Sequence, residues 1–193
     1  MDIYNAIQQS TNPTERIRLL GLLQHVTVAA QDFKGIDTID VLLGVIADAT
    51  DAATAQPEGP RICSLAMAGL VRIVSIPRVR GLFHLTGLDS VRVVMRAMHA
   101  HPSIHCLVLG SFVLCNLMTP FMPSDLTVRI CLVLLRASSQ IDAPRARAGC
   151  IAVIHNLERK MKSTNDVNWP VVLKLASRLQ DKRDTVAILC AAA

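Results

Sequence analysis

A twelve-residue phrase occurs twice in this chain, and the repetition constrains the fold more than any other feature. The first copy reads GIDTIDVLLGVI at 35–46, and the second reads GLDSVRVVMRAM at 87–98. The apolar positions match in character, whereas positions 40 and 44 differ freely from positions 92 and 96. A helix would turn these free positions outward. Internal repetition of this kind is typical of arrays in which one helical unit stacks on copies of itself.

A second repeat, independent of the first, relates two later blocks. Residues 93–117 superpose on residues 133–157 without a gap. The earlier block 35–76 follows the same plan with extra residues at 51–59, which we expect to form a surface loop. The period is therefore about 40 residues. The positions that recur are Arg96 and Arg136; Gly69, Gly110 and Cys150; and Ser75, Asn116 and Asn156.

The composition favours an all-α fold. Aromatic residues make up 3% of the chain, and its apolar residues are mainly Leu, Val, Ile, Ala and Met. Sheets prefer aromatic and β-branched side chains, so this balance indicates helices. Asn12 and Pro13 are suited to begin a helix. We expect a short polar cap or a frayed end at 1–12 and helices at 13–30, 35–49, 60–75, 78–86, 88–100, 104–118, 124–138, 144–161, 169–179 and 184–193.

The run 104–122 has no Asp, Glu, Lys or Arg and is nineteen residues long. A bilayer span needs about 20 apolar residues. His105, Asn116 and Pro120 interrupt the run, so we interpret it as a fully buried helix at the centre of a stack and expect no membrane partner.

The N-terminus and the cysteines indicate a reducing compartment. The first residues lack the basic start and apolar core of a secretory signal. The six cysteines form no C-x-x-C pair and lie in apolar runs, as buried small hydrophobes would. We therefore expect a cytoplasmic protein, with the nucleus as the alternative.

The charges are divided unevenly. Residues 1–58 hold eight acidic and three basic side chains, whereas 59–193 hold seven and seventeen. The basic part suits an acidic protein, a nucleic acid or an anionic surface, although solvated or intramolecular arginines are the preferred explanation. Few aromatics are present to stack bases, which weakens an RNA-binding interpretation. The arginines concerned are Arg72, Arg92, Arg96, Arg129, Arg136, Arg145, Arg147 and Arg159.

The block 80–118 resembles the armadillo repeat, in which a short helix and a Gly precede two longer antiparallel helices, the last ending in Asn-Leu. The residues that carry the resemblance are 86–88, 94–103 and 110–117. The related HEAT repeat is an alternative. The resemblance implies a right-handed superhelical solenoid of about four units within one domain, 1–193. The approximate units are 13–34, 35–76, 77–119, 120–162 and 163–193.

The resemblance also implies a binding groove. In armadillo proteins that bind extended peptides, the repeated Asn pairs with the peptide backbone, and a Trp lies four residues before it. The Asn positions here are Asn116 and Asn156, with Ser75 in register, and the position of the Trp is aromatic only at Phe112. An amide suits this task because it both donates and accepts hydrogen bonds. Alternatively, each Asn bonds within its own helix or stack.

No catalytic motif, phosphate loop or metal-ligand set is evident, and we expect neither an enzyme nor a cofactor. The sequence predicts a protein–protein interaction scaffold that holds an extended or helical partner segment. A basic nucleic-acid or phosphate-binding module and a structural subunit of a large assembly are the alternatives. The predicted groove residues are Phe112, Asn116, Asn156, Arg96, Arg136 and Ser75.

Overall fold

The computed structural model describes residues 3–25, 36–51, 57–74, 87–118, 122–161 and 167–180. Every regular element in this part of the chain is an α-helix, which confirms the all-α prediction. The chain divides into two compact units, residues 1–117 and 118–193. The predicted helices at 78–86 and 184–193 lie outside the described residues.

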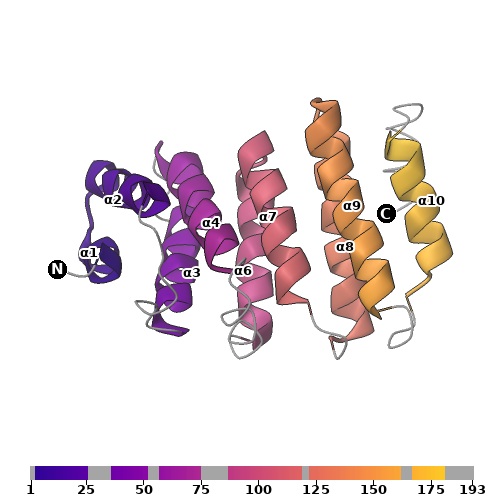
Figure 1. Cartoon of the computed structure of the whole chain (residues 1–193), viewed down its shortest axis with the longest axis horizontal. Coiled ribbons are helices and arrows are strands. Elements are labelled where there is room, and N and C mark those ends of the chain that lie inside the picture. The colour runs from indigo at the N-terminus through magenta and orange to yellow at the C-terminus, as the bar shows by residue number, and fades with distance from the viewer. Residues whose placement is uncertain are drawn as a thin grey trace. The chain divides into compact units, whose positions relative to one another are not determined.

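Unit 1 contains six described helices, which Figure 1 labels. The helices α3 and α4 form one pair, and α6 and α7 form the next. Corresponding helices of the two pairs contact each other, because α3 packs against α6 and α4 packs against α7. This is the packing that a stacked repeat requires within the unit. The bounds are α1 Ile3–Gln9, α2 Pro13–His25, α3 Ile36–Thr50, α4 Gly59–Val74, α6 Gly87–Ala100 and α7 Ile104–Leu117.

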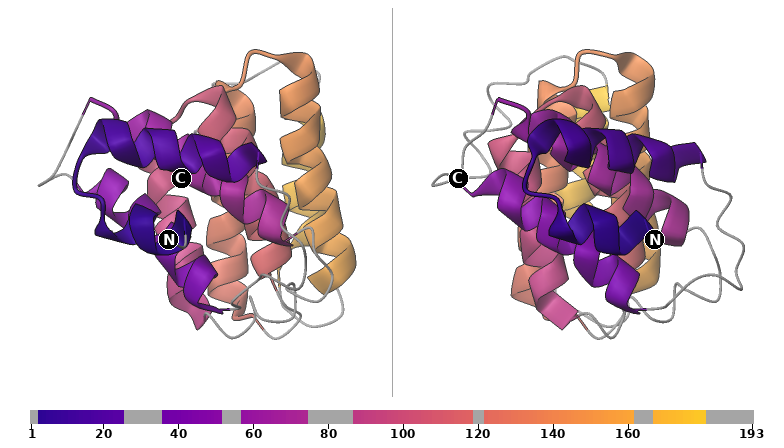
Figure 2. Two further views of the ribbon diagram at one scale, coloured as in Figure 1. Left: turned by 60° about the vertical axis from the view of Figure 1, so that its left-hand side comes forward. Right: turned by 90° about the vertical axis from the view of Figure 1, so that its left-hand side faces the viewer.

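The N-terminal end of unit 1 is covered by two further helices, α1 over α3 and α2 over α4 (Figure 2). The Asn12 side chain caps α2 by accepting a 2.9 Å hydrogen bond from the backbone N–H of Thr14, as the sequence predicts. The first twelve residues were expected to be a polar cap or a frayed end, but they contain the helix α1. Ile7 explains the difference, because it is fully buried and anchors α1 on the unit.

Close approach of neighbouring helices explains two of the repeated glycines. A Cβ added to Gly110 would lie 2.6 Å from Cγ of Met98, and one added to Gly69 would lie 3.2 Å from a methyl group of Leu42. Any side chain at position 110 would collide with α6. The small residues predicted at these positions therefore allow α7 to approach α6 and α4 to approach α3.

Unit 2 contains α8 Ser124–Gln140, α9 Pro144–Met161 and α10 Trp169–Gln180, with α8 packed on both α9 and α10. Its buried positions repeat those of unit 1. The α9 positions 150, 151, 153, 154 and 157 are buried, as are the α7 positions 110, 111, 113, 114 and 117. The same agreement links positions 38, 39, 42, 45 and 46 of α3, positions 90, 91, 94, 97 and 98 of α6, and positions 130, 131, 134, 137 and 138 of α8.

Candidate functional site

Two of the predicted groove residues lie one turn apart on the outward side of α7. Phe112 is 44% exposed, which is unusual for a large aromatic side chain. The Asn116 amide donates a 2.9 Å hydrogen bond to the Phe112 carbonyl oxygen. This bond lies within the same helix, which was the alternative to the groove interpretation.

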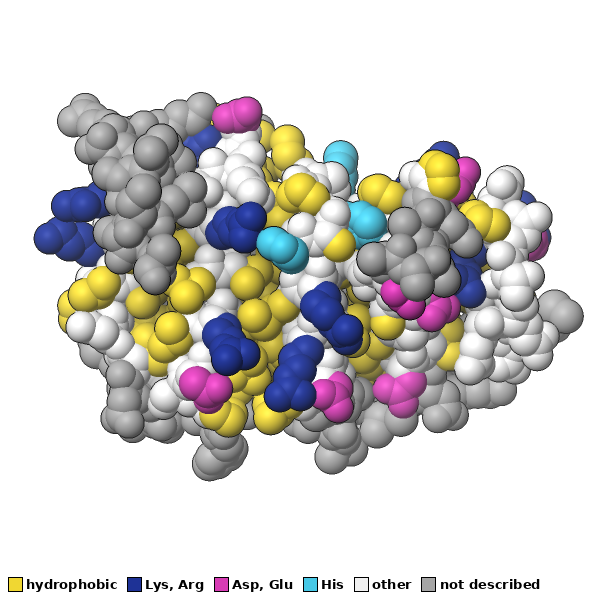
Figure 3. Space-filling view, turned by 180° about the vertical axis from the view of Figure 1, so that it is seen from behind, with side chains coloured by type: hydrophobic (Ala, Val, Ile, Leu, Met, Phe, Trp, Pro, Cys, Tyr) yellow, Lys and Arg dark blue, Asp and Glu magenta, His cyan; other side chains and the backbone are white. Residues whose placement is uncertain are grey.

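Arg96 points away from these two residues. Gly110 of α7 faces Met98 of α6, since a Cβ added to Gly110 would lie 2.6 Å from Cγ of Met98. Phe112 and Arg96 are each two residues from that contact, which turns them by about 200° around their helices. The structure therefore places Phe112 and Arg96 on opposite sides of the α6–α7 pair. Figure 3 views the molecule from behind, where α6 lies nearer than α7, and shows Lys and Arg side chains gathered among hydrophobic ones.

The remaining predicted residues belong to unit 2 or lie outside the described residues. Asn156 of α9 accepts a hydrogen bond from the Arg159 guanidinium, so its amide is also engaged within its own helix. Arg136 is exposed on α8. Ser75 lies outside the described residues.

Several arginines of the basic series bind within their own unit. Arg72 of α4 donates to the carbonyl oxygens of Leu23 and Gln24 at the end of α2. Arg147 is buried and donates a 2.9 Å hydrogen bond to the carbonyl oxygen of Ile141 after α8. These two arginines stabilise helix C-termini rather than offer a surface to a partner.

The outward face of α7 is apolar, and it corrects the prediction of a fully buried helix. Ile104 is 42% exposed, Phe112 is 44% exposed, and Val108 between them is half-buried. These residues are four apart and share one face. A helix without charged residues is fully buried only if neighbouring elements cover all of its sides. Hydropathy alone therefore could not distinguish a buried helix from a helix with one exposed apolar side.

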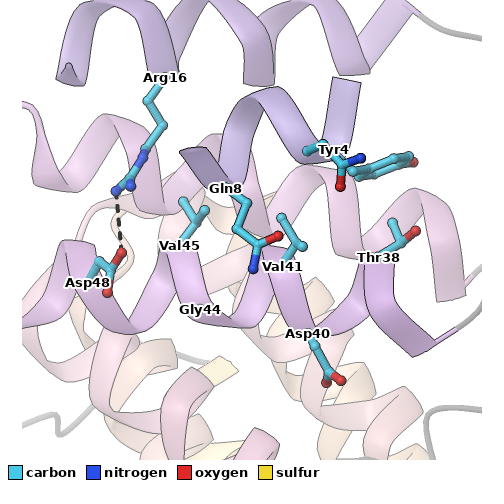
Figure 4. A pocket seen from close by; sticks show the side chains of 10 residues that line it. Tyr4, Gln8, Arg16, Thr38, Asp40, Val41, Gly44, Val45 and Asp48 are labelled. Atoms are coloured by element: carbon cyan, nitrogen blue, oxygen red, sulfur yellow. Dashed lines mark hydrogen bonds and ion pairs between the residues drawn. The ribbon is translucent and has the colours of Figure 1, made fainter. Parts of the chain in front are cut away.

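A pocket of about 570 Å³, here called the α1–α3 pocket, was not predicted. It lies between α1, α2 and α3 of unit 1 (Figure 4). Arg16 and Asp48 mark one end of it, Tyr4 and Thr38 mark the other, and Gln8 reaches from α1 toward α3 between them. The other lining residues are Asn5, Asp40, Val41, Gly44 and Val45.

The charged groups of the α1–α3 pocket come from two helices. The guanidinium of Arg16 lies 3.5 Å from the Asp48 carboxylate, and its Nε donates to the Ser10 carbonyl oxygen at 3.1 Å. Asp40 stands at the edge of α3 farther from α1 in Figure 4, is exposed, and makes no hydrogen bond or ion pair with a described residue. The lining thus has two carboxylates and one guanidinium.

Two sequence features are related to this pocket, although neither predicts it alone. Ile3 and Ile7 are four residues apart, which is the spacing of an amphipathic helix, although seven residues are too few for a firm prediction. Gly44 is the second feature, because the overlay of the two phrases pairs it with Arg96. A glycine in the middle of a helix leaves space where other copies have a long side chain.

The described cysteines and ionisable residues form no metal site and no reactive thiol pair that the structure shows. Among the described residues no group of three His, Cys, Asp or Glu side chains could hold a metal ion. The Sγ atoms of Cys63 and Cys106 lie 3.9 Å apart and both residues are buried. The hydrogen bond between them, together with burial, raises the pKa of the Cys63 thiol, and burial raises the pKa of Cys131 to about 12. These two thiols therefore stay protonated and poorly nucleophilic near neutral pH.

Comparison of the chain with protein-family models, with curated proteins and with solved structures gives no match. Within the described residues, no helix combines the length and the apolar character needed to cross a membrane. The internal repeat and the surfaces of each unit are therefore the features that indicate a function.

Proposed function

We propose that the protein is a non-enzymatic protein–protein interaction scaffold of the armadillo-like solenoid type. It holds a partner segment against the outward side of its repeated helices, with α7 as the principal contact. The proposal is supported by the repetition of burial pattern between copies and by the pairing of α3 with α6 and of α4 with α7. Helical repeats of this kind present extended surfaces for partner binding.

The exposed apolar face of α7 carries the proposal. Ile104 and Phe112 each leave about two fifths of their surface open to water, and α7 contains no Asp, Glu, Lys or Arg. Exposed large apolar side chains that share a face are a feature of interaction sites. Phe112 would serve as the aromatic anchor, since aromatic residues are enriched among those that dominate binding energy. Asn116, one turn away, could exchange its bond to the Phe112 carbonyl for one to a peptide backbone.

Selection of peptides on the immobilised full chain tests this proposal without knowledge of the natural partner. We expect 16-residue phage-displayed peptides to yield binders, and the double variant Ile104→Asp/Phe112→Asp to weaken their affinity at least about tenfold because charged groups would replace the apolar anchors. Affinity is measured by fluorescence polarisation. Asn116→Ala should give a smaller loss.

The matched control is Leu88→Asp, which alters an equally exposed leucine on α6. Binders that lose affinity to Leu88→Asp as much as to the α7 variant would contradict the α7 surface. Unchanged helical circular dichroism in all variants is required, and exposure of the altered residues makes this the expected result.

Nucleic-acid binding is the second candidate, favoured by Arg96 and Arg136. Both are exposed one repeat apart, and neither forms an ion pair with a described residue. Two phosphate contacts would give a weak affinity for a single strand that falls about sevenfold between 50 and 200 mM salt. Failure of a fluorescent single-stranded RNA to bind in 20 mM salt would eliminate this candidate; binding that survives Arg96→Gln/Arg136→Gln would exclude these arginines as its basis.

A further inference from the structure

The α1–α3 pocket shares no residue with the α7 face and is not explained by the function proposed for that face. Its volume of about 570 Å³ falls within the range of roughly 300–1,000 Å³ that ligand pockets occupy. Its walls are mixed, with Val41 and Val45 on α3 and polar side chains from α1 and α2. The size and the mixed lining of the pocket therefore suit a ligand other than the segment proposed to bind α7.

The pocket lies where the repeat leaves out a side chain. Asp40, Gly44 and Asp48 are spaced by four residues, all three are exposed, and they form one row along α3. A Cβ added to Gly44 would meet nothing within 4 Å. In the next copies the same position is occupied by Arg96 and Arg136. The first copy thus lacks the arginine and has a hollow between two carboxylates in its place.

The charge of the hollow selects a cation. Arg16 lies beside Asp48, whereas the Asp40 carboxylate has no partner among the described residues, so the lining retains a net negative charge. The surrounding sequence strengthens this field, because residues 1–58 hold eight acidic and only three basic side chains. Neutral acceptors are also present in Gln8 and Thr38, which suits a cation that donates several hydrogen bonds.

We propose that the α1–α3 pocket receives the guanidinium group of an arginine side chain carried by a partner protein. The guanidinium lies over Gly44 and donates to Asp40 on one side and toward Asp48 on the other, while the aliphatic stem packs on Val41 and Val45. Arginine fits better than lysine because its planar group donates in two directions at once and is more weakly hydrated. The partner supplies the side chain that the first copy of the repeat does not have.

The test uses Nα-acetyl-arginine amide as the probe and the full chain labelled with ¹⁵N. We expect saturable amide shifts in α1 and α3, including Gln8, Thr38 and Gly44. Nα-acetyl-citrulline amide has nearly the same shape without the charge. It should require about a tenfold higher concentration to give the same shift, as loss of a charge-assisted hydrogen bond predicts.

Two variants locate the site. Asp40→Asn should weaken the arginine probe about tenfold, because it removes the charge but keeps the shape. Gly44→Arg should abolish binding, because it fills the hollow with the side chain that the other copies have at this position. Gly149→Arg is the matched control, since Gly149 also lies in a helix and a Cβ added to it would meet nothing within 4 Å, but it belongs to unit 2. The control should bind the probe like the wild type.

Several results would overturn the proposal. These are equal responses to the arginine and citrulline probes, unaltered binding by Gly44→Arg, and shifts confined to residues outside α1 and α3. Pocket shifts that arise on raising the protein concentration without probe would instead make a second copy the occupant, which also overturns it. Ile104→Asp/Phe112→Asp should leave arginine binding intact, so failure of the α7 proposal and failure of this one are distinguishable.

Discussion

The two helices α3 and α6 are built from copies of one phrase, yet their outward surfaces carry opposite charge. The buried α3 positions 38, 39, 42, 45 and 46 coincide with the buried α6 positions 90, 91, 94, 97 and 98. Their outward rows differ, because α3 presents Asp40 and Gly44 where α6 presents Arg92 and Arg96. α3 also packs against α1, and Gly44 is among the residues that line the pocket between these helices. Packing thus fixes the inward half of a repeat, whereas the outward half is free to vary between copies.

The largest effect expected from this comparison is a matched loss of stability at equivalent core positions. Ile46 and Met98 occupy the same place in the two copies, and each is 2% exposed or less. Ile46→Ala and Met98→Ala should each lower the free energy of unfolding by about 3 kcal/mol, from lost burial and the cavity left behind. Urea unfolding followed by circular dichroism measures both. A loss at one position and none at the other would contradict the equivalence of α3 and α6.

A smaller loss is expected where α7 approaches α6. Gly110→Val should destabilise the protein by about 2 kcal/mol, because the new side chain collides with Met98 in a closed space. Gly44→Val, with open space around it, is the control for the change in helix propensity. Thermal unfolding of the two variants compares them directly, and an equal shift in both would show that the collision is relieved without cost.

A gain in stability is expected from Gly44→Ala. A Cβ at this position meets nothing, and alanine restricts the unfolded chain more than glycine does, so stability should rise by about 0.5–1 kcal/mol. The measurement is again urea unfolding. A decrease would indicate that the backbone at Gly44 needs glycine for a reason other than the pocket.

The smallest effect concerns the outward ion pair of α6. Asp89 and Arg92 are both exposed and their charged groups lie 3.1 Å apart. Arg92→Ala should change the free energy of unfolding by no more than about 0.5 kcal/mol, as is usual for exposed pairs three residues apart. A decrease of more than about 1 kcal/mol in the free energy of unfolding would show that the outward row of α6 contributes to stability. It would contradict the distinction between inward and outward halves of the repeat.

The described helices other than α1 could be predicted from the sequence because their signals are local. Asn12 and Pro13 mark the start of α2, and the spacing of apolar residues in the phrase defines α3 and α6. Gly110 could be assigned to a close helix contact because the repeat places a small residue at that point.

The surfaces were harder to predict because they depend on which face is covered. Phe112 and Arg96 were assigned to one groove, but the facing of Gly110 and Met98 turns them apart. α1 was missed because its burial depends on Ile7 reaching a surface made by distant residues. The α1–α3 pocket requires three helices to meet, and no periodicity within one helix reports such a meeting.

The uncharged outer side of α7 has a consequence for how the protein would retain what it binds. Sodium chloride screens ion pairs but has little to screen on a surface without formal charge, and sulfate strengthens apolar association. A partner bound at Phe112 would therefore remain bound in a high-salt wash that releases a partner bound at Asp40. Washing at increasing ionic strength would thus separate partners according to the site at which each is bound.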